Sequence, residues 1–169
     1  MDFFETVKKR KAVRHFLPQK IDREKIEEIL KAVNLAPSAG NIQAYKIYVV
    51  EDEAKIKTIA NACLGQSFIA EAPVVFIFCA NPQESAAKYG KRGEELYNLQ
   101  DATIATSYAT LAITALGLSS CWVGAFNEKE IQTILNTNLR PVAVIPVGQP
   151  AEEPSRRKRK NIEEIAEFV

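Results

Sequence analysis

The sequence has 169 residues, of which 47% are hydrophobic and 25% are charged, and its formal net charge is +1. These values predict an ordinary globular protein with a core of its own, so we expect residues 1–169 to form a single domain. The near-neutral charge argues against a protein that coats nucleic acid, because such proteins carry a strong basic excess.

The three cysteines are widely separated and form no CxxC pair. This spacing disfavours a disulfide framework and a zinc site, and it favours a reducing cytoplasm. The first residues, MDFFETVKK, lack the apolar stretch and small-residue cleavage site of a secretory signal. We therefore expect a cytoplasmic protein.

Apolar periodicity and capping residues predict the elements of the first half of the chain. In order, they are a helix over 2–11, a helix beginning at Asp22, a strand over 46–50, a helix capped by Asp52 and a strand over 73–80. The last of these is a continuous apolar run, which is typical of a central strand covered on both faces.

The second half alternates helices and strands in the same way. The pattern predicts a long helix over 94–116, a short strand or extended turn over 120–126, a helix over 127–136, a strand over 140–148 and a terminal helix beginning at Asn161. No repeat and no long linker divides the chain, so the sequence predicts one α/β or α+β domain.

Residues 102–126 contain no charged side chain, and their length alone would permit a membrane crossing. Threonines and serines make the run only mildly hydrophobic, and Gly117 interrupts it, so we interpret it as a buried helix followed by a buried strand and expect no membrane partner. Small residues recur along this helix, and they suit either a dimer interface or packing within the chain: Ala105, Ala109, Ala112 and Ala115.

The sequence offers little acid–base chemistry. Its one histidine, His15, has no GxSxG motif or reactive cysteine setting beside it, so a partly exposed packing residue is the simpler interpretation. HExxH, Cys/His clusters, the GxxxxGK[ST] phosphate loop and GxGxxG are all missing. We therefore expect no metal and no catalytic side chain, and any redox chemistry would come from a bound cofactor.

Two basic clusters, at Lys8–Arg14 and Arg156–Lys160, lie near the two ends of the chain. Each alone is compatible with a solvated charged face, whereas both together could bind one phosphate, because guanidinium groups bind phosphate through paired hydrogen bonds. Between them, the loop over 35–44 carries Ser38, Asn41 and Gln43. This loop is either a helix stop followed by a turn or a polar contact for the edge of a planar heterocycle.

Four segments, taken together and in order, resemble the signature regions of the FMN-dependent nitroreductase family. They are RKAVRHF (10–16), APSAGNIQ (36–43), DATIATSYATLAITALGLSSCWVGAF (101–126) and PVGQPAEEPSRRKRKNIEE (146–164). The segments span nearly the whole chain.

The resemblance implies an α+β fold, with a mostly antiparallel central sheet in a three-layer α/β/α arrangement, and an obligate homodimer holding two FMN molecules at its interface. It also implies contacts to FMN from matching positions. The phosphate and ribityl contacts are Arg10, Lys11, Arg14, Arg157 and Arg159; the contacts from the partner subunit are Pro37, Ser38, Asn41 and Gln43; the backbone donors to flavin N5 are Gly124 and Ala125.

The implied activity is that of an NAD(P)H-dependent oxidoreductase. NADH or NADPH would reduce FMN at N5, and a small acceptor such as a nitroaromatic, a quinone or free flavin would then oxidise it in a ping-pong cycle. Ala12 and Ala44-Tyr45 depart from the family's usual Ser and Pro-Trp, which affects the expected pocket.

Other functions remain open from the sequence: flavin storage or sensing, a specialised branch such as reductive dehalogenation or heterocycle oxidation, and a nucleic-acid-binding module.

Overall fold

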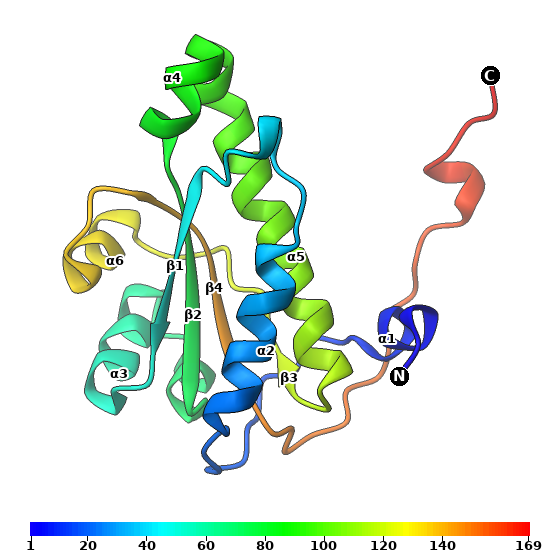
Figure 1. The fold of residues 1–169 in the computed structure, drawn as a ribbon. Coiled ribbons are helices and arrows are strands. Elements are labelled where there is room, and N and C mark those ends of the chain that lie inside the picture. The colour runs from blue at the N-terminus through cyan, green and yellow to red at the C-terminus, as the bar shows by residue number, and fades with distance from the viewer.

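The computed structural model describes residues 1–169 and contains six α-helices and four strands (Figure 1). In chain order they are α1 (Phe3–Lys9), α2 (Arg23–Asn34), β1 (Tyr45–Val50), α3 (Glu53–Ala62), β2 (Val74–Ala80), α4 (Pro82–Arg92), α5 (Asn98–Ala115), β3 (Ser119–Ser120), α6 (Glu128–Leu135) and β4 (Arg140–Gly148). A π-helical segment over Gly93–Tyr97 joins α4 to α5, and short 3-10 turns lie at Ala39–Asn41, Ser67–Glu71 and Ile162–Glu164.

The four strands form one sheet in the order β1-β2-β4-β3, and every neighbouring pair is antiparallel. β1 pairs along its whole length with β2, and β2 pairs with β4 on its other side, so β2 and β4 occupy the centre. β1 is an edge strand, which explains why most of its residues are not fully buried.

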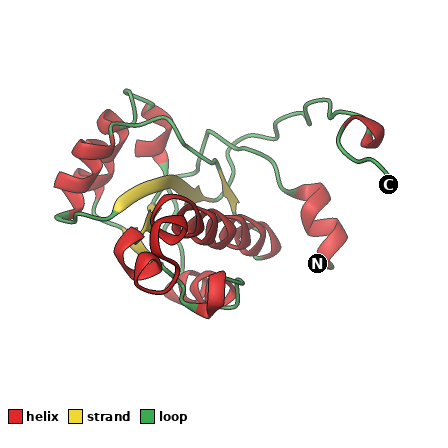
Figure 2. Cartoon of the chain, turned by 90° about the horizontal axis from the view of Figure 1, so that it is seen from above, coloured by secondary structure: helices red, strands yellow, loops and turns green.

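Alternation along β2 divides the core into two halves, because successive side chains of a strand point to opposite faces. Val74, Phe76 and Phe78 pack with α2 and α5 on one face. Val75, Ile77 and Cys79 pack with α3 and α6 on the other face. Helices therefore cover both faces of the sheet, as Figure 2 shows, and every residue of β2 is buried.

The expected fold class, a three-layer α+β fold with a mostly antiparallel sheet, is thus confirmed. The strands predicted over 46–50, 73–80 and 140–148 agree with β1, β2 and β4 to within one residue. Two of the alanines with alternative interpretations, Ala105 and Ala109, are fully buried against the sheet, so they serve packing within the chain.

Three boundaries differ from expectation. The first helix ends at Lys9, which leaves Arg10 and Lys11 outside it. The long helix begins at Asn98, after the unexpected helix α4 and the π-helical segment. The terminal helix is a single 3-10 turn: Asn161 and Glu164 form the expected capping box, but the turn buries no side chain, and a helix that buries nothing is marginal in water.

Two glycines shape the hairpin formed by α4 and the π-helical segment. Gly90 has φ of +56° and ψ of −143°, a conformation that a side chain disfavours strongly. Gly93 lies so close to α4 that an added Cβ would be 2.4 Å from the carbonyl oxygen of Ser85. The chain therefore turns at Gly90 and packs back on itself at Gly93 before α5 begins.

Both ends of the chain extend away from the body of the protein on the same side (Figures 1 and 2). α1 exposes its apolar residues, with Phe4 at 73% of its full accessibility, and the tail after residue 160 exposes Ile162, Ile165 and Phe168. These segments thus carry apolar side chains that the chain itself does not cover. None of the helices combines the length and apolar character that crossing a membrane requires.

Candidate active site

The two basic clusters come together around one cavity of about 710 Å³. Its walls come from only two short segments, one after α1 and one after β4: Arg10, Lys11, Ala12 and Arg14, and Pro154, Ser155, Arg156, Arg157, Lys158 and Arg159. All five residues expected to contact a phosphate line this cavity. Segments about 140 residues apart in the sequence therefore form one strongly basic site.

Backbone pairing next to the sheet brings these segments together. The amide of Val13 donates to the carbonyl of Ser120 in β3 at 3.1 Å. The amide of Leu17 donates to Gln149, and the amide of Ala151 donates to His15, both at 2.9 Å. Because β3 and the end of β4 belong to the sheet, the rigid core fixes the position of the basic segments.

The cavity carries more positive charge than the chain neutralises. Burial lowers the pKa of Arg10, and repulsion from Arg159 and Arg156 lowers it further. Such mutual repulsion destabilises the cluster unless a negative group binds among the guanidinium groups. The donor set is therefore suited to a phosphate or another multivalent anion.

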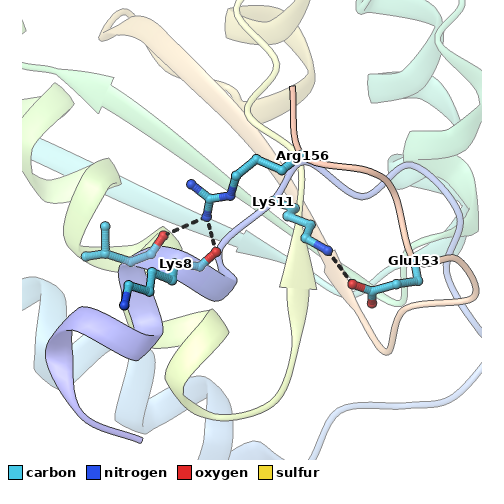
Figure 3. Close-up of polar contacts among 5 residues, drawn as sticks. Lys8, Lys11, Glu153 and Arg156 are labelled. Carbon is cyan, nitrogen blue, oxygen red and sulfur yellow. Dashed lines mark hydrogen bonds and ion pairs between the residues drawn. The ribbon is translucent and has the colours of Figure 1, made fainter. Parts of the chain in front are cut away.

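Some of the cavity's polar groups already have partners (Figure 3). Lys11 pairs with Glu153, and this contact lowers the pKa of that carboxyl group. The amide of Arg14 donates to Glu152 at 2.6 Å. Arg156 donates to the carbonyl groups of Val7 and Lys8 at the end of α1. Arg156 thus acts as a cap for α1, a role that the run of five cations did not reveal.

The polar loop after α2 is held mainly by its own side chains. Ser38 Oγ accepts a hydrogen bond from the amide of Gln43 at 3.0 Å, and the Gln43 side chain donates to Asn34. Three of the loop's residues have φ near +56°: Gly40, Asn41 and Gln43. A left-handed backbone is costly for residues with a side chain, so the internal hydrogen bonds stabilise a conformation that the sequence would not adopt alone.

One buried carboxylate attaches this loop to α5. Asp101 is only 2% exposed, and its Oδ1 accepts a hydrogen bond from the amide of Ala39 at 2.9 Å. Its other oxygen, Oδ2, has no hydrogen-bond partner within the chain. Sequence reasoning missed Asp101, because an acidic residue on a helix is ordinarily a solvated carboxylate.

The segment after β3 presents free backbone donors. The amides of Gly124 and Ala125 donate to no group in the chain, and both residues are exposed. An added Cβ at Gly124 would find open space apart from Trp122 at 4.0 Å. The side chain of Gln66 donates to the carbonyl of Ala125 at 3.2 Å and so helps to hold the segment in place.

A single chain does not bring all of these groups to one place. The loop is anchored at Asp101, near the start of α5, whereas the basic segments pair with β3, which follows the end of α5. The part of α5 from Asp101 to Ala115 is roughly 20 Å long, at 1.5 Å per residue. In Figure 1 the loop and the basic segments accordingly lie near opposite ends of α5.

Comparison with known proteins identifies the chain's relatives. The sequence profile of the Nitroreductase family matches residues 7–68 and 61–149. The chain belongs to the nitroreductase family. A protein of Archaeoglobus fulgidus that carries an NADH dehydrogenase/NAD(P)H nitroreductase name is 31% identical over 150 residues, which is 85% of this chain and 83% of the relative.

Solved nitroreductase structures agree with the fold. A nitroreductase family protein from Clostridium novyi superposes with a TM-score of 0.83 at 34% identity and covers 93% of this chain and 89% of its own. One from Streptococcus pneumoniae reaches a TM-score of 0.90 at 23% identity and covers 99% and 100% of the two chains. The four signature segments therefore occur in a chain that has the family's fold.

Proposed function

We propose that this protein is an FMN-dependent oxidoreductase. It transfers two electrons from NADH or NADPH to a small acceptor such as a nitroaromatic, a quinone or free flavin. A Bacillus subtilis relative named FMN reductase, NAD(P)H, is 27% identical over 168 residues, and a Thermus thermophilus relative named NADH dehydrogenase is 27% identical over 180 residues. These names support a flavin and a nicotinamide nucleotide as reactants.

The basic cavity is the observation that carries the proposal. A phosphate monoester bears close to two negative charges, and it would relieve the repulsion among Arg10, Arg156 and Arg159. We assign Arg10, Lys11, Arg14, Arg157 and Arg159 to the FMN phosphate and its neighbouring hydroxyl groups. Lys11 would exchange its contact with Glu153 for one with the cofactor.

The remaining predicted residues serve the ring system. The free amides of Gly124 and Ala125 are donors suited to the N5 edge, and they would stabilise negative charge on the reduced ring. The loop residues Pro37, Ser38, Asn41 and Gln43 would flank the ring. The Ser38 hydroxyl and the Gln43 side chain already have partners, so Asn41 is the loop residue with the freest side chain.

The separation along α5 supports a shared site. Because the loop and the basic cavity of one chain lie near opposite ends of this helix, we infer that the loop of one subunit meets the cavity of the other in a homodimer. The exposed apolar side chains of α1 and of the tail provide surface for such an interface.

FMN, when bound, would supply the electron-carrying chemistry that the side chains of this protein lack. The protein would bind the phosphate, orient the ring and hold a donor at N5, while the nucleotide and the acceptor take turns in one pocket. Alternating occupancy predicts ping-pong kinetics.

The test begins with the colour and the cofactor of the purified protein. We expect a yellow protein that releases FMN on denaturation, identified by mass spectrometry, and that oxidises NADH or NADPH when an acceptor is present. Release of FAD alone would refute the cofactor assignment. Bound FMN that NADH and NADPH both fail to reduce would instead indicate flavin storage or sensing.

A further inference from the structure

The hairpin beside the polar loop carries four side chains to which the proposed function gives no role. The Lys88 ammonium lies 5.5 Å from the centre of the Tyr89 ring, and the rings of Tyr89 and Tyr97 are 5.2 Å apart and nearly perpendicular. The Arg92 guanidinium lies 5.3 Å from the centre of the Tyr97 ring, and its Nε donates to Tyr97 Oη at 2.9 Å. We call these four residues the hairpin cluster.

The hairpin cluster borders the polar loop directly. Lys88 Nζ donates to the carbonyl of Gly40 at 3.4 Å. An added Cβ on Gly40 would lie 2.2 Å from Tyr89 Oη, so the tyrosine packs against the loop backbone. Tyr97 also lines a cavity of about 600 Å³ together with loop residues 37–39. A ligand in this cavity would therefore contact Tyr97, and Arg92 lies next to it through its hydrogen bond to Tyr97.

The cluster depends on an unusual backbone. Gly90 turns the chain with φ of +56°, and Gly93 packs against the carbonyl of Ser85. The π-helical turn that follows brings Tyr97 within hydrogen-bond distance of Arg92. π-Helical turns are rare and occur frequently at functional sites. The arrangement is thus more specific than a charged face of a regular helix.

Two cations of the cluster lack carboxylate partners. Neither Lys88 nor Arg92 forms a salt bridge, whereas Lys91, which lies between them in sequence, pairs with Glu95 at 3.6 Å. The nearby acidic group Asp101 is buried and bonded to the amide of Ala39. Arg92 uses Nε for Tyr97, which leaves its terminal N–H groups free to bind an anion.

We propose that the hairpin cluster is an anion-accepting subsite for the electron acceptor. It binds the carboxylate or phosphate group of a planar aromatic acceptor through Arg92 and Lys88, while the tyrosines contact the acceptor's ring. The inference rests on the proposed function, because the polar loop places the cluster beside the flavin. The 2′-phosphate of NADPH offers the same chemistry, so the test separates the two sources.

The test compares 4-nitrobenzoate with 4-nitrobenzamide, which share a nitrophenyl ring and differ in charge. Arg92→Gln should lower kcat/KM for 4-nitrobenzoate about tenfold and change it less than twofold for 4-nitrobenzamide, because glutamine keeps a donor for Tyr97 but loses the charge. Lys88→Gln should act in the same direction. Lys91→Gln is the matched control and should change neither value.

A binding measurement gives an independent readout. Titration calorimetry on the oxidised, FMN-loaded protein should show tighter binding of 4-nitrobenzoate than of 4-nitrobenzamide, and Arg92→Gln should remove the difference. High salt should weaken binding of the anion selectively, because the site is exposed.

Several results would overturn the subsite: equal losses for both acceptors, an equal effect of Lys91→Gln, or equal affinities in the wild type. A changed NADPH-to-NADH preference in Arg92→Gln, with acceptor selectivity intact, would overturn the acceptor assignment and place the nucleotide phosphate here. Failure of the proposed function has a different signature, because the wild type would then lack FMN or resist reduction by NAD(P)H.

Discussion

The arginines at the basic cavity differ from the neighbouring lysine of α1 in what they contact. Arg10 and Arg159 line the cavity, whereas Lys8 contributes only its backbone carbonyl, which accepts a hydrogen bond from Arg156. Arg10→Ala or Arg159→Ala should weaken FMN binding by about 1.5–3 kcal/mol, the range for a hydrogen bond to a charged group.

Lys8→Ala is the control and should leave the affinity unchanged, because alanine keeps the carbonyl and favours helix. Fluorescence titration of deflavinated protein with FMN gives the dissociation constants. Equal constants for the three variants and the wild type would remove the phosphate assignment.

The three cysteines are buried and unpaired. Burial raises the pKa of Cys63 and Cys79 to about 12 and also raises the pKa of Cys121. At pH 8 only about one Cys63 thiol in ten thousand would be ionised, so we expect alkylation by iodoacetamide to require unfolding. Mass spectrometry of native and denatured protein after alkylation checks this, and rapid labelling of the native protein would contradict it.

The same shift has a consequence for stability. Because the folded-state pKa of these thiols lies above their ordinary value of 9.0, ionisation favours the unfolded chain. The free energy of unfolding should therefore fall as the pH rises from about 9 towards 12. The reducing compartment that the cysteine spacing favours stays a prediction.

At the scale of elements, the hairpin of α4 and the π-helical segment depends on close packing at Gly93. An alanine there would place its Cβ 2.4 Å from the Ser85 carbonyl oxygen. We expect Gly93→Ala to lower the free energy of unfolding by about 2–3 kcal/mol, because overpacking forces the backbone to shift.

Gly117→Ala provides the comparison, since that glycine has φ of +76° but open space around its Cβ position. Its cost should be about 1 kcal/mol, from the left-handed conformation alone. Urea denaturation measures both variants, and a smaller loss for Gly93→Ala than for Gly117→Ala would contradict the packing argument.

Local patterns predicted most elements and missed those that depend on distant contacts. β2 and β4 follow from apolar runs, and Asp52 caps α3 as expected through the amide of Lys55. α4 escaped detection because Gly90 and many polar residues interrupt its pattern. At Asn161 the sequence predicted a helix that does not form. The expected capping box is present, but the 3-10 turn that follows buries no side chain and does not continue into a helix.

In the candidate site, too, local sequence predicted some features and missed those that depend on distant contacts. Residue type identified the two basic clusters, and the family resemblance implied that they contact one phosphate, but only the pairing of residues 12–17 with β3 and residues 149–151 brings the two clusters together. Asp101 and the hairpin cluster carried no signal, because their importance comes from burial and from a kinked backbone rather than from a motif.

At the scale of the whole molecule, we propose an obligate homodimer of single-domain chains with shared active sites. Co-refolding of Arg159→Ala with Asn41→Asp tests the sharing. A heterodimer would combine both defects in one site and leave the other site intact, so up to half of the wild-type activity per heterodimer should return. If each chain built its own site, no activity would return. An active, FMN-loaded monomer in light scattering would refute the dimer itself.

The backbone pairing between the two ends of the chain also affects how the folded protein opens. The amides of Leu17 and Ala151 each bond to the opposite terminal segment, and Arg156 holds the last carbonyls of α1. Neither end can therefore separate without breaking contacts of the other, and the two ends should open as one cooperative unit. In native-state hydrogen exchange, Leu17 and Ala151 should show the same opening free energy, and Arg156→Gln should accelerate exchange of the Arg10 amide, which closes α1 on Thr6. Independent exchange of the two termini would show that each end of the polypeptide unfolds alone.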